Sequence, residues 1–277
     1  VELISVATRS PEHTPHALQA LEAGKYVFLE KPIALSYDEA LSLKKADSKY
    51  PGKLFFRHNR RFESAFQHIR EIIASGKLGN VYEIKLRRHN YQRRDDWQTI
   101  KECGGGQLNN WGPHLLDHAL CFIGSPVKEI WSDLRQVAAA GDCEDHLKIV
   151  IKGESGVLVD IEISGGAAVN EPEYIIFGTK GGLTCKGSEI TLRHLDPKVK
   201  LKPVKADRGT PNGFTSEQLP WIEKTIAVAP KLKVDTDSIW DCIYDTVRNK
   251  KKFPITLEWA SEIVRITEFI KKKSPFK

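Results

Sequence analysis

The chain has 277 residues, of which 40% are hydrophobic and 28% are charged. That length is enough for one large domain or two ordinary ones, and the balance of residue types is that of a globular protein rather than a disordered one. The net charge of +6 permits anionic ligands, but it is mild and spread along the chain, so it does not by itself indicate nucleic acid as a partner.

The cysteines and the apolar runs indicate in which cellular compartment the protein is expected. Five cysteines occur, and no pair has the spacing of a metal site or of a Cys-x-x-Cys motif, so we expect reduced thiols and no metal. No apolar run is long enough to span a bilayer, and we expect no signal peptide. Together these features predict a cytoplasmic protein that binds neither a membrane nor nucleic acid.

The first 60 residues alternate short apolar runs with helical patterns. Gly24 is expected to close the first helix, and Ser36 with Glu39 three residues on predicts the N-cap of the second. Strands that are continuous apolar runs between helices indicate a parallel sheet covered on both faces, the α/β arrangement of a doubly wound domain. The predicted strands are 3–7, 26–29 and 53–56, and the predicted helices are 13–23 and 37–49.

The pattern changes after residue 60. Longer strands with one polar face now dominate, which is typical of an antiparallel sheet. Residues 196–216 contain proline, glycine and lysine and are predicted to form a long surface loop. The fold class is therefore predicted as α/β followed by α+β, the second part being a mostly antiparallel open sheet flanked by helices. Helices are expected at 63–75, 113–123, 235–249 and 257–273, and strands at 81–88, 127–136, 146–152, 156–163, 173–178 and 189–195.

Glu30-Lys31-Pro32 directly follows the strand predicted at 26–29. The carboxyl ends of parallel strands are where ligands bind in doubly wound folds. A lysine there can donate a hydrogen bond to a substrate hydroxyl and stabilise developing negative charge. Pro32 could fix the turn, with a cis peptide bond as one option. The alternative is an ordinary lysine at a strand end.

A second motif runs from Gly104 to Asp117, where three glycines predict a flexible loop that leads into the next helix. Pro113 fits the first helical position, which places His114 in the first turn. The positive end of the helix dipole disfavours imidazolium, so we expect His114 to be neutral and able to accept a proton, with Asp117 orienting the imidazole. The alternatives are a packed structural histidine and a capping role for Asn110.

In order and spacing, these motifs resemble the glucose–fructose oxidoreductase / inositol dehydrogenase / MocA family over nearly the whole chain. The resemblance implies that residues 1–60 are the C-terminal half of a dinucleotide-binding Rossmann domain, and that residues 61–277 form an α+β domain for substrate binding and homo-oligomerisation through its sheet. It also implies NAD or NADP as cofactor and a small carbohydrate or polyol as substrate. The stretches that carry it are Ser5-Val-Ala-Thr8 with Pro11 and His13, Ala20 to Lys25 leading into Glu30-Lys31-Pro32, and Gly104 to Gly112 with His114 and Asp117.

Carried over residue by residue, the resemblance implies Lys31 and His114 as the catalytic lysine and histidine. Asn110 stands four residues before that histidine, where many members carry aspartate. An amide cannot take up a proton, although it can hydrogen-bond a hydroxyl, so this departure keeps the reaction type open. The positions that match the nicotinamide side of the family's cofactor pocket are Thr8, Pro11, His13, Glu30 and Lys31.

The sequence lacks the Gly-x-Gly-x-x-Gly turn that follows the family's first strand and the ribose-selecting residue that follows its second. Gly104 to Gly106 is no substitute, because it does not lie between a parallel strand and its helix. The chain also contains no methionine, even at position 1. We therefore expect about 60 residues before Val1, at ~30 residues per strand–helix unit, and NAD and NADP both stay open.

Basic and aromatic residues near the two motifs are candidates for holding the substrate. Arg60 follows the strand predicted at 53–56, and Trp111 lies in the glycine-rich segment. Together with Asp117 they are predicted to contact the substrate, the indole by stacking on a sugar face. Solvated loops and core packing are the favoured interpretation for most of the other arginines and aromatics.

Three hypotheses about function follow. The first is a nicotinamide-dependent oxidoreductase that transfers a hydride to or from a sugar, polyol or cyclitol carbon, with His114 taking the hydroxyl proton and Lys31 steadying the oxygen. The second is an NAD-dependent glycoside hydrolase of the same superfamily, which Asn110 keeps open. The third is a non-catalytic oligomeric binding protein, consistent with a truncated chain that is inactive.

Overall fold

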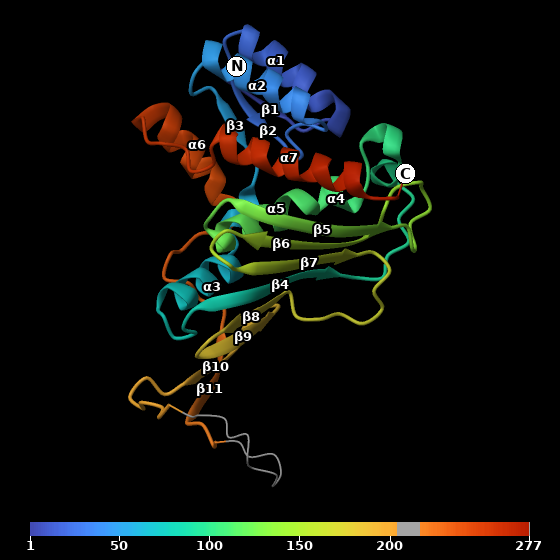
Figure 1. Cartoon of the computed structure of the whole chain (residues 1–277). Coiled ribbons are helices and arrows are strands. Elements are labelled where there is room, and N and C mark those ends of the chain that lie inside the picture. Colours follow the sequence, from blue (N-terminus) through green and yellow to red (C-terminus); the bar gives the residue numbers. More distant parts are fainter. Residues whose placement is uncertain (204–216, 277) are drawn as a thin grey trace.

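The computed structural model describes residues 1–203 and 217–276. They form two sheets with helices between and around them (Figure 1). A three-stranded sheet lies in the N-terminal part, and an eight-stranded sheet makes up most of the remainder. Within these ranges no helix is both long and apolar enough to cross a membrane.

The first sheet is parallel, with the strand order β1-β2-β3. All of β3 is buried, and so are the last three residues of β2. Strands covered on both faces have no polar side to show, which is why they appear in the sequence as continuous apolar runs. The α/β arrangement is confirmed. Its elements are β1 (Leu3–Val6), α1 (His13–Glu22), β2 (Tyr26–Leu29), α2 (Tyr37–Lys49) and β3 (Leu54–Phe56).

The predicted capping residues set the ends of α1 and α2. The Ser36 hydroxyl accepts a hydrogen bond from the Glu39 backbone N–H at 3.2 Å, and the Glu39 carboxylate accepts one from the Leu35 N–H at 2.7 Å. Gly24 follows α1 with a φ of 73°, a conformation that costs glycine little. These local contacts determine where α1 ends and where α2 begins.

The second sheet has the strand order β11-β10-β9-β8-β4-β7-β6-β5. Its neighbouring strands are antiparallel except for β4 and β7, which run parallel, so the mostly antiparallel sheet is confirmed. The strands are β4 (Val81–His89), β5 (Val127–Arg135), β6 (His146–Gly153), β7 (Leu158–Ser164), β8 (Tyr174–Gly178), β9 (Gly181–Lys186), β10 (Glu189–Leu195) and β11 (Trp221–Ala227).

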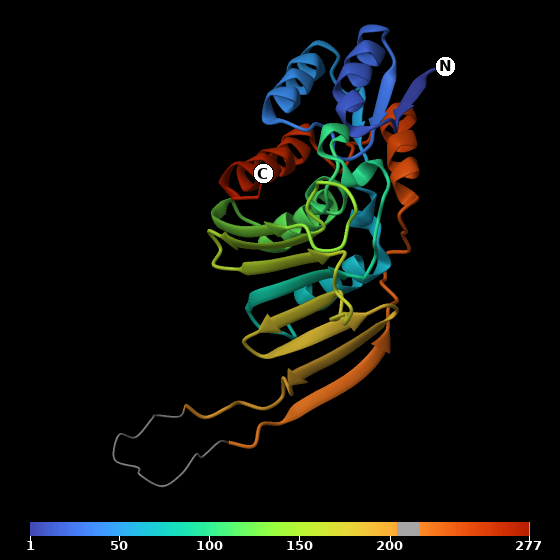
Figure 2. The ribbon, with the colours of Figure 1, turned by 90° about the vertical axis from the view of Figure 1, so that its right-hand side faces the viewer.

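Helices separate the two sheets, as Figures 1 and 2 show. Apolar side chains of α3, α5 and α7 share one core with the buried face of the second sheet. α7 also contacts α2 and β3, so it lies between the two sheets. The remaining helices are α3 (Ser64–Ala74), α4 (Gln107–Asn110), α5 (Gly112–Ile123), α6 (Ser238–Asn249) and α7 (Leu257–Lys273), with 3-10 turns at Ser10–Glu12, Asn59–Phe62, Trp97–Thr99 and Lys101–Cys103.

The C-terminal helices return to the N-terminal sheet. Ile239 of α6 and Val264 of α7 belong to the same hydrophobic core as β2 and β3. The ring of Phe28 meets Trp240 edge-on, with the centroids 4.6 Å apart. The domain boundary at residue 60 therefore remains a proposal. In the folded chain, α6 and the start of α7 pack with the first sheet.

The sequence interpretation misses two strands, β9 and β11. β9 begins with Gly181-Gly182, a pair that has low strand propensity, and its pairing to β8 and β10 overrides that preference. β11 pairs only with β10 and is largely exposed, so it lacks a clear apolar alternation. Of the loop predicted at 196–216, residues 196–203 lie outside helices and strands, and 204–216 fall outside the described residues.

Candidate active site

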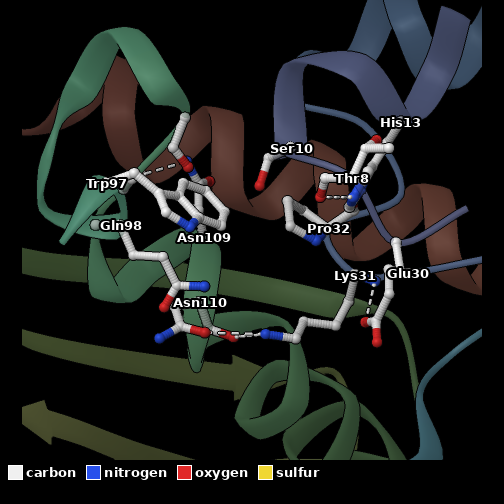
Figure 3. Close-up of a pocket in the computed structure, with 14 residues that line it drawn as sticks. Thr8, Ser10, His13, Glu30, Lys31, Pro32, Trp97, Gln98, Asn109 and Asn110 are labelled. Atoms are coloured by element: carbon white, nitrogen blue, oxygen red, sulfur yellow. Dashed lines mark hydrogen bonds between the residues drawn. The ribbon is translucent and has the colours of Figure 1, made fainter.

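The candidate site lies at the carboxyl ends of β1 and β2, where they face the segment between β4 and α5 (Figure 3). The parallel sheet brings the residues that follow both strands to one edge. Across from them lie Gln98 and Asn110, and a cavity of about 200 Å³ remains between the two sides. Its lining residues are Ala7, Thr8, Ser10, His13, Glu30, Lys31, Pro32, Trp97, Gln98, Gly104, Gly105, Gly106, Asn109 and Asn110.

Lys31 points across this cleft to Asn110 (Figure 3). Its Nζ donates to the Asn110 side-chain Oδ1 and to the Asn110 backbone oxygen, each at 2.9 Å. The Lys31–Pro32 peptide bond is cis. Burial lowers the pKa of Lys31, and the carboxylate of Glu30 partly opposes that shift. The two sequence motifs, 79 residues apart, therefore meet through a direct contact.

The glycine-rich segment is a defined turn rather than the flexible loop expected from sequence. Gly106 has a φ of 98°, and a Cβ at this position would lie 2.3 Å from a carboxylate oxygen of Glu144. The Asn109 side chain donates to the Gly104 and Gly105 carbonyls at 3.0 Å, and it accepts from Lys271 Nζ at 2.8 Å. These contacts hold α4, and with it Asn110, in front of Lys31.

His114 lies in the first turn of α5, as predicted, and is only 6% exposed. The helix starts one residue earlier than expected, so Pro113 is its second residue. No described residue hydrogen-bonds the Nδ1 of His114. Burial, followed by the charges of Lys31 and Arg60, holds the pKa of His114 well below its ordinary value of 6.5. The imidazole is therefore neutral near pH 7 and can accept a proton.

Asp117 does not orient His114. Its Oδ1 accepts from the Trp259 indole N–H at 2.7 Å, and its carboxylate forms a two-point ion pair with Arg61. Burial alone would raise the pKa of Asp117, but the hydrogen bond and charge of Arg61, together with the neighbouring His58 and His118, outweigh it and hold the pKa below the ordinary value. At 1% exposure and with these partners, Asp117 joins α5 to Arg61 and α7, and its predicted substrate contact remains a proposal.

The residues predicted to hold the cofactor differ in their surroundings. Thr8 is exposed in the cleft, whereas Pro11 lies in the turn before α1 and does not line it. The ring of His13 joins two loops, with Nδ1 2.7 Å from the Pro32 oxygen and Nε2 3.1 Å from the Thr8 oxygen. Glu30 accepts from the Lys31 backbone N–H at 3.0 Å, and its other oxygen is 2.5 Å from Arg57.

Arg60 and Trp111 do come together, but not as expected. The guanidinium carbon of Arg60 lies 4.1 Å from the centre of the Trp111 ring, and that of Arg88 lies 4.0 Å from it. The indole that was expected to stack on a sugar is thus already in contact with two guanidinium groups. Its ring also meets the edge of His114, with 5.8 Å between centroids.

Sequence reasoning overlooked His58, which is 2% exposed and follows β3 at the same edge of the sheet. Neither of its ring nitrogens has a hydrogen-bond partner among the described residues. Burial lowers the pKa of His58 to about 4, with smaller effects from Asp117, which raises it, and from Arg61, which lowers it further. The available signal was its place two residues after a buried parallel strand, which the neighbouring arginines obscured.

Two family models match the chain. Residues 1–58 match the NAD-binding Rossmann fold of an oxidoreductase family, and residues 66–184 match the GFO/IDH/MocA C-terminal domain. The chain belongs to the Gfo/Idh/MocA family of oxidoreductases. The resemblance seen in the sequence is confirmed.

Individual members of this family are similar over different lengths. The chain is 26% identical over 278 residues to the scyllo-inositol 2-dehydrogenase (NADP(+)) IolW of Bacillus subtilis, covering 97% of this chain and 75% of that protein. It is 33% identical over 192 residues to the 2,7-anhydro-N-acetylneuraminate hydratase of Escherichia coli, covering 66% and 51%. The chain thus spans about half the length of some curated relatives that it matches.

The same fold also occurs in solved structures of other proteins. An NAD-binding protein from Listeria innocua superposes with a TM-score of 0.82 and 24% identity, covering 99% of this chain and 80% of that one. This likeness concerns the fold of the whole chain, including the arrangement of both sheets.

The residues present fit one end of the nicotinamide cofactor that the Rossmann match implies, NAD or NADP. The cleft opens at the carboxyl edge of the parallel strands, where dinucleotides bind in such folds. Exposed Thr8 and the side chains of Ser10 and Gln98 offer hydrogen-bonding groups there, and Lys31 reaches its far wall. These residues would hold the end of the cofactor that lies nearest to Lys31.

Proposed function

We propose that this chain carries the catalytic side of a nicotinamide-dependent oxidoreductase that transfers a hydride to or from a sugar, polyol or cyclitol carbon. The observation that supports it most is the direct contact of Lys31 with Asn110 beside the carboxyl edge of a parallel sheet, with the buried, neutral His114 near enough for the charge of Lys31 to lower its pKa. The inositol dehydrogenase among its relatives points to the same substrate class.

The residues have separate roles in this proposal. His114 takes the proton of the substrate hydroxyl, since its ring is neutral and its Nδ1 has no partner among the described residues. Lys31 donates to the same oxygen as negative charge develops. Asn110 holds Lys31 in place and offers its amide N–H to a second hydroxyl. A bound nicotinamide would supply the hydride acceptor, while His114 holds the proton of the hydroxyl.

Several further expectations belong to the same proposal. Thr8, Pro11, His13 and Glu30 are proposed to lie along the cofactor, of which Pro11 is the least supported because it does not line the cleft. The parts 1–60 and 61–277 are proposed as the dinucleotide-binding and substrate domains. A homo-oligomer is proposed to assemble through the eight-stranded sheet.

The test is reduction of NAD or NADP by the full-length protein with a panel of sugars and cyclitols, repeated with His114→Ala. Removing a general base is expected to lower kcat by about 10²–10⁴-fold. The matched control is His16→Ala, which removes an exposed histidine of α1 away from the cleft and should keep full activity. Normal turnover by His114→Ala would exclude the role proposed for His114.

A second candidate is a reaction without net oxidation, such as glycoside cleavage or hydration. Asn110 supports it, because the amide replaces a group that could share a proton with Lys31. A relative named as a hydratase points the same way. Product formation from an aryl glycoside or an anhydro sugar, with no accumulation of NADH or NADPH, would favour this candidate over the first.

A further inference from the structure

A second cavity, of about 450 Å³, lies beside the candidate active site and is not part of the cleft described above. Its walls come from the turn before α3, the start of α5, and the strands β4, β8 and β9. Leu115, Ala65 and Val228 supply apolar surface, and the hydroxyl-bearing ring of Tyr174 faces the same space. The cavity combines apolar walls with a few polar groups, the composition of a small-molecule pocket.

Arg60 and Arg88 both line this cavity, next to Trp111. The guanidinium carbons of Arg60 and Arg88 both lie about 4 Å from the centre of the Trp111 ring, at 4.1 Å and 4.0 Å. The flat indole holds both groups by cation–π contact and limits where they can point. The indole therefore contacts both guanidinium groups, and each of them is held against its ring.

The two acidic residues near these arginines, Glu63 and Glu173, have other interaction partners. Glu63 forms an ion pair with Arg60, and a Glu173 oxygen accepts from the Gly187 backbone N–H at 3.0 Å. Among the residues that the structure describes, no carboxylate forms an ion pair with Arg88. Burial and the charge of Arg60 lower the pKa of Arg88, and they outweigh the opposing influence of Glu63 and Glu173. Glu63 and Glu173 line the same cavity and are the carboxylates that act on Arg88, but neither forms an ion pair with it among the described residues.

Trp111 joins this cavity to the reacting groups. It follows Asn110 in the chain, and its ring meets the edge of His114 at a centroid distance of 5.8 Å. Arg60 is close enough to both Lys31 and His114 to lower the pKa of each. A ligand that reaches from His114 past Trp111 would therefore bring its far end to Arg88.

We propose that this cavity binds an anionic group of the substrate, a carboxylate or a phosphate, at Arg88 beside the Trp111 ring. Guanidinium groups suit both anions, because their N–H donors pair with two oxygens at once. The inference rests on the proposed function, since it names the substrate class of that site. It narrows the expected substrates from neutral polyols to sugar acids or sugar phosphates.

The test measures binding and turnover separately, with one sugar in three forms: glucose, glucuronate and glucose 6-phosphate. Calorimetric titration of the full-length protein should show at least tenfold tighter binding of one charged form than of glucose. Whichever charged form binds better identifies the anion. Arg88→Met should reduce that preference by about tenfold or more, and Arg88→Lys should retain part of it, because the charge stays while the paired donors are lost.

The matched control is Arg93→Met, which removes an exposed arginine outside both cavities and should leave the preference unchanged. Equal or better binding of glucose than of both anions would overturn the proposal, and so would an unchanged preference in Arg88→Met with its fold intact by circular dichroism. Turnover decides the proposed function independently. Charged ligands that bind through Arg88 but are never oxidised would refute the dehydrogenase, not the anion site.

Discussion

At the scale of single residues, burial sets the protonation of the histidines around the candidate site. His58, His114 and His118 all lie on or beside α5 or the edge of the first sheet, and burial is the largest cause of the lowered pKa of each. His118 has partners, the Arg60 carbonyl at 2.9 Å and the Tyr174 hydroxyl at 3.3 Å. Of the three, only His114 also lies in the first turn of a helix that begins beside Asn110.

The contact between Lys31 and Asn110 gives a prediction about pH dependence. In Asn110→Asp, a carboxylate would replace the amide oxygen that lies 2.9 Å from Lys31 Nζ. An opposite charge at that distance stabilises the ammonium and raises its pKa, by about one unit or more. If activity needs the charged lysine, the alkaline limb of kcat/KM against pH should move to higher pH by that amount.

The control for this shift is Asn90→Asp, which adds the same charge at an exposed position beyond β4. It should leave the limb in place. If the alkaline limb of kcat/KM does not move in Asn110→Asp, the protonation of Lys31 does not determine the pH dependence of the reaction.

The sequence placed the proposed catalytic residues in the fold better than it placed their partners. Lys31, Asn110 and His114 were found because each sits at a recognisable place, a strand end or a helix start. The role of orienting His114 was wrongly given to Asp117, because a spacing of three residues on a helix shows which side chains are neighbours but not which other groups compete for them. Arg61 and Trp259 come from distant parts of the chain and take both carboxylate oxygens.

At the scale of elements, the boundaries that local contacts determine were predictable. The start of α2 matches the expected residue because Ser36 and Glu39 satisfy backbone N–H groups within their own turn. β9 was not predictable in this way, because its two leading glycines become a strand only through pairing on both sides. Tertiary pairing, absent from any local window, decides such segments.

The cap at Ser36 should make a measurable contribution to the stability of the protein. Ser36→Ala removes the acceptor for the Glu39 N–H and should lower the free energy of unfolding by about 1 kcal/mol. Ser42→Ala is the matched control, because Ser42 is an exposed residue of the same helix whose hydroxyl bonds only to the Asp38 carbonyl of the preceding turn. Urea unfolding followed by circular dichroism measures both. Equal stability of the two variants would show that the cap contributes nothing.

At the scale of the whole molecule, buried neutral histidines couple the fold to pH. The pKa of His58 is about 4 in the folded chain, against an ordinary 6.5. The unfolded chain therefore takes up a proton first as the pH falls, which favours unfolding. At about 1.4 kcal/mol per pKa unit, the folded state loses on the order of 3 kcal/mol from this residue between pH 6.5 and pH 4.

This loss is testable by chemical unfolding at several pH values. His58→Gln should lose less stability than the natural chain between pH 6.5 and pH 4, because glutamine does not titrate. His16→Gln, which replaces an exposed histidine, should follow the natural chain. Parallel stability curves for all three proteins would contradict a buried neutral His58.

The return of α6 and α7 to the first sheet has a consequence for how the chain is made. A ribosome releases residues in order, at ~5–20 per second. β3 ends at Phe56, but Ile239, which helps to cover that sheet, follows roughly 180 residues later. For roughly 10–40 seconds, apolar surface of the nascent sheet therefore stays uncovered and can be bound by chaperones. This sheet, which precedes most of the described chain, is thus among the last parts to have its core covered.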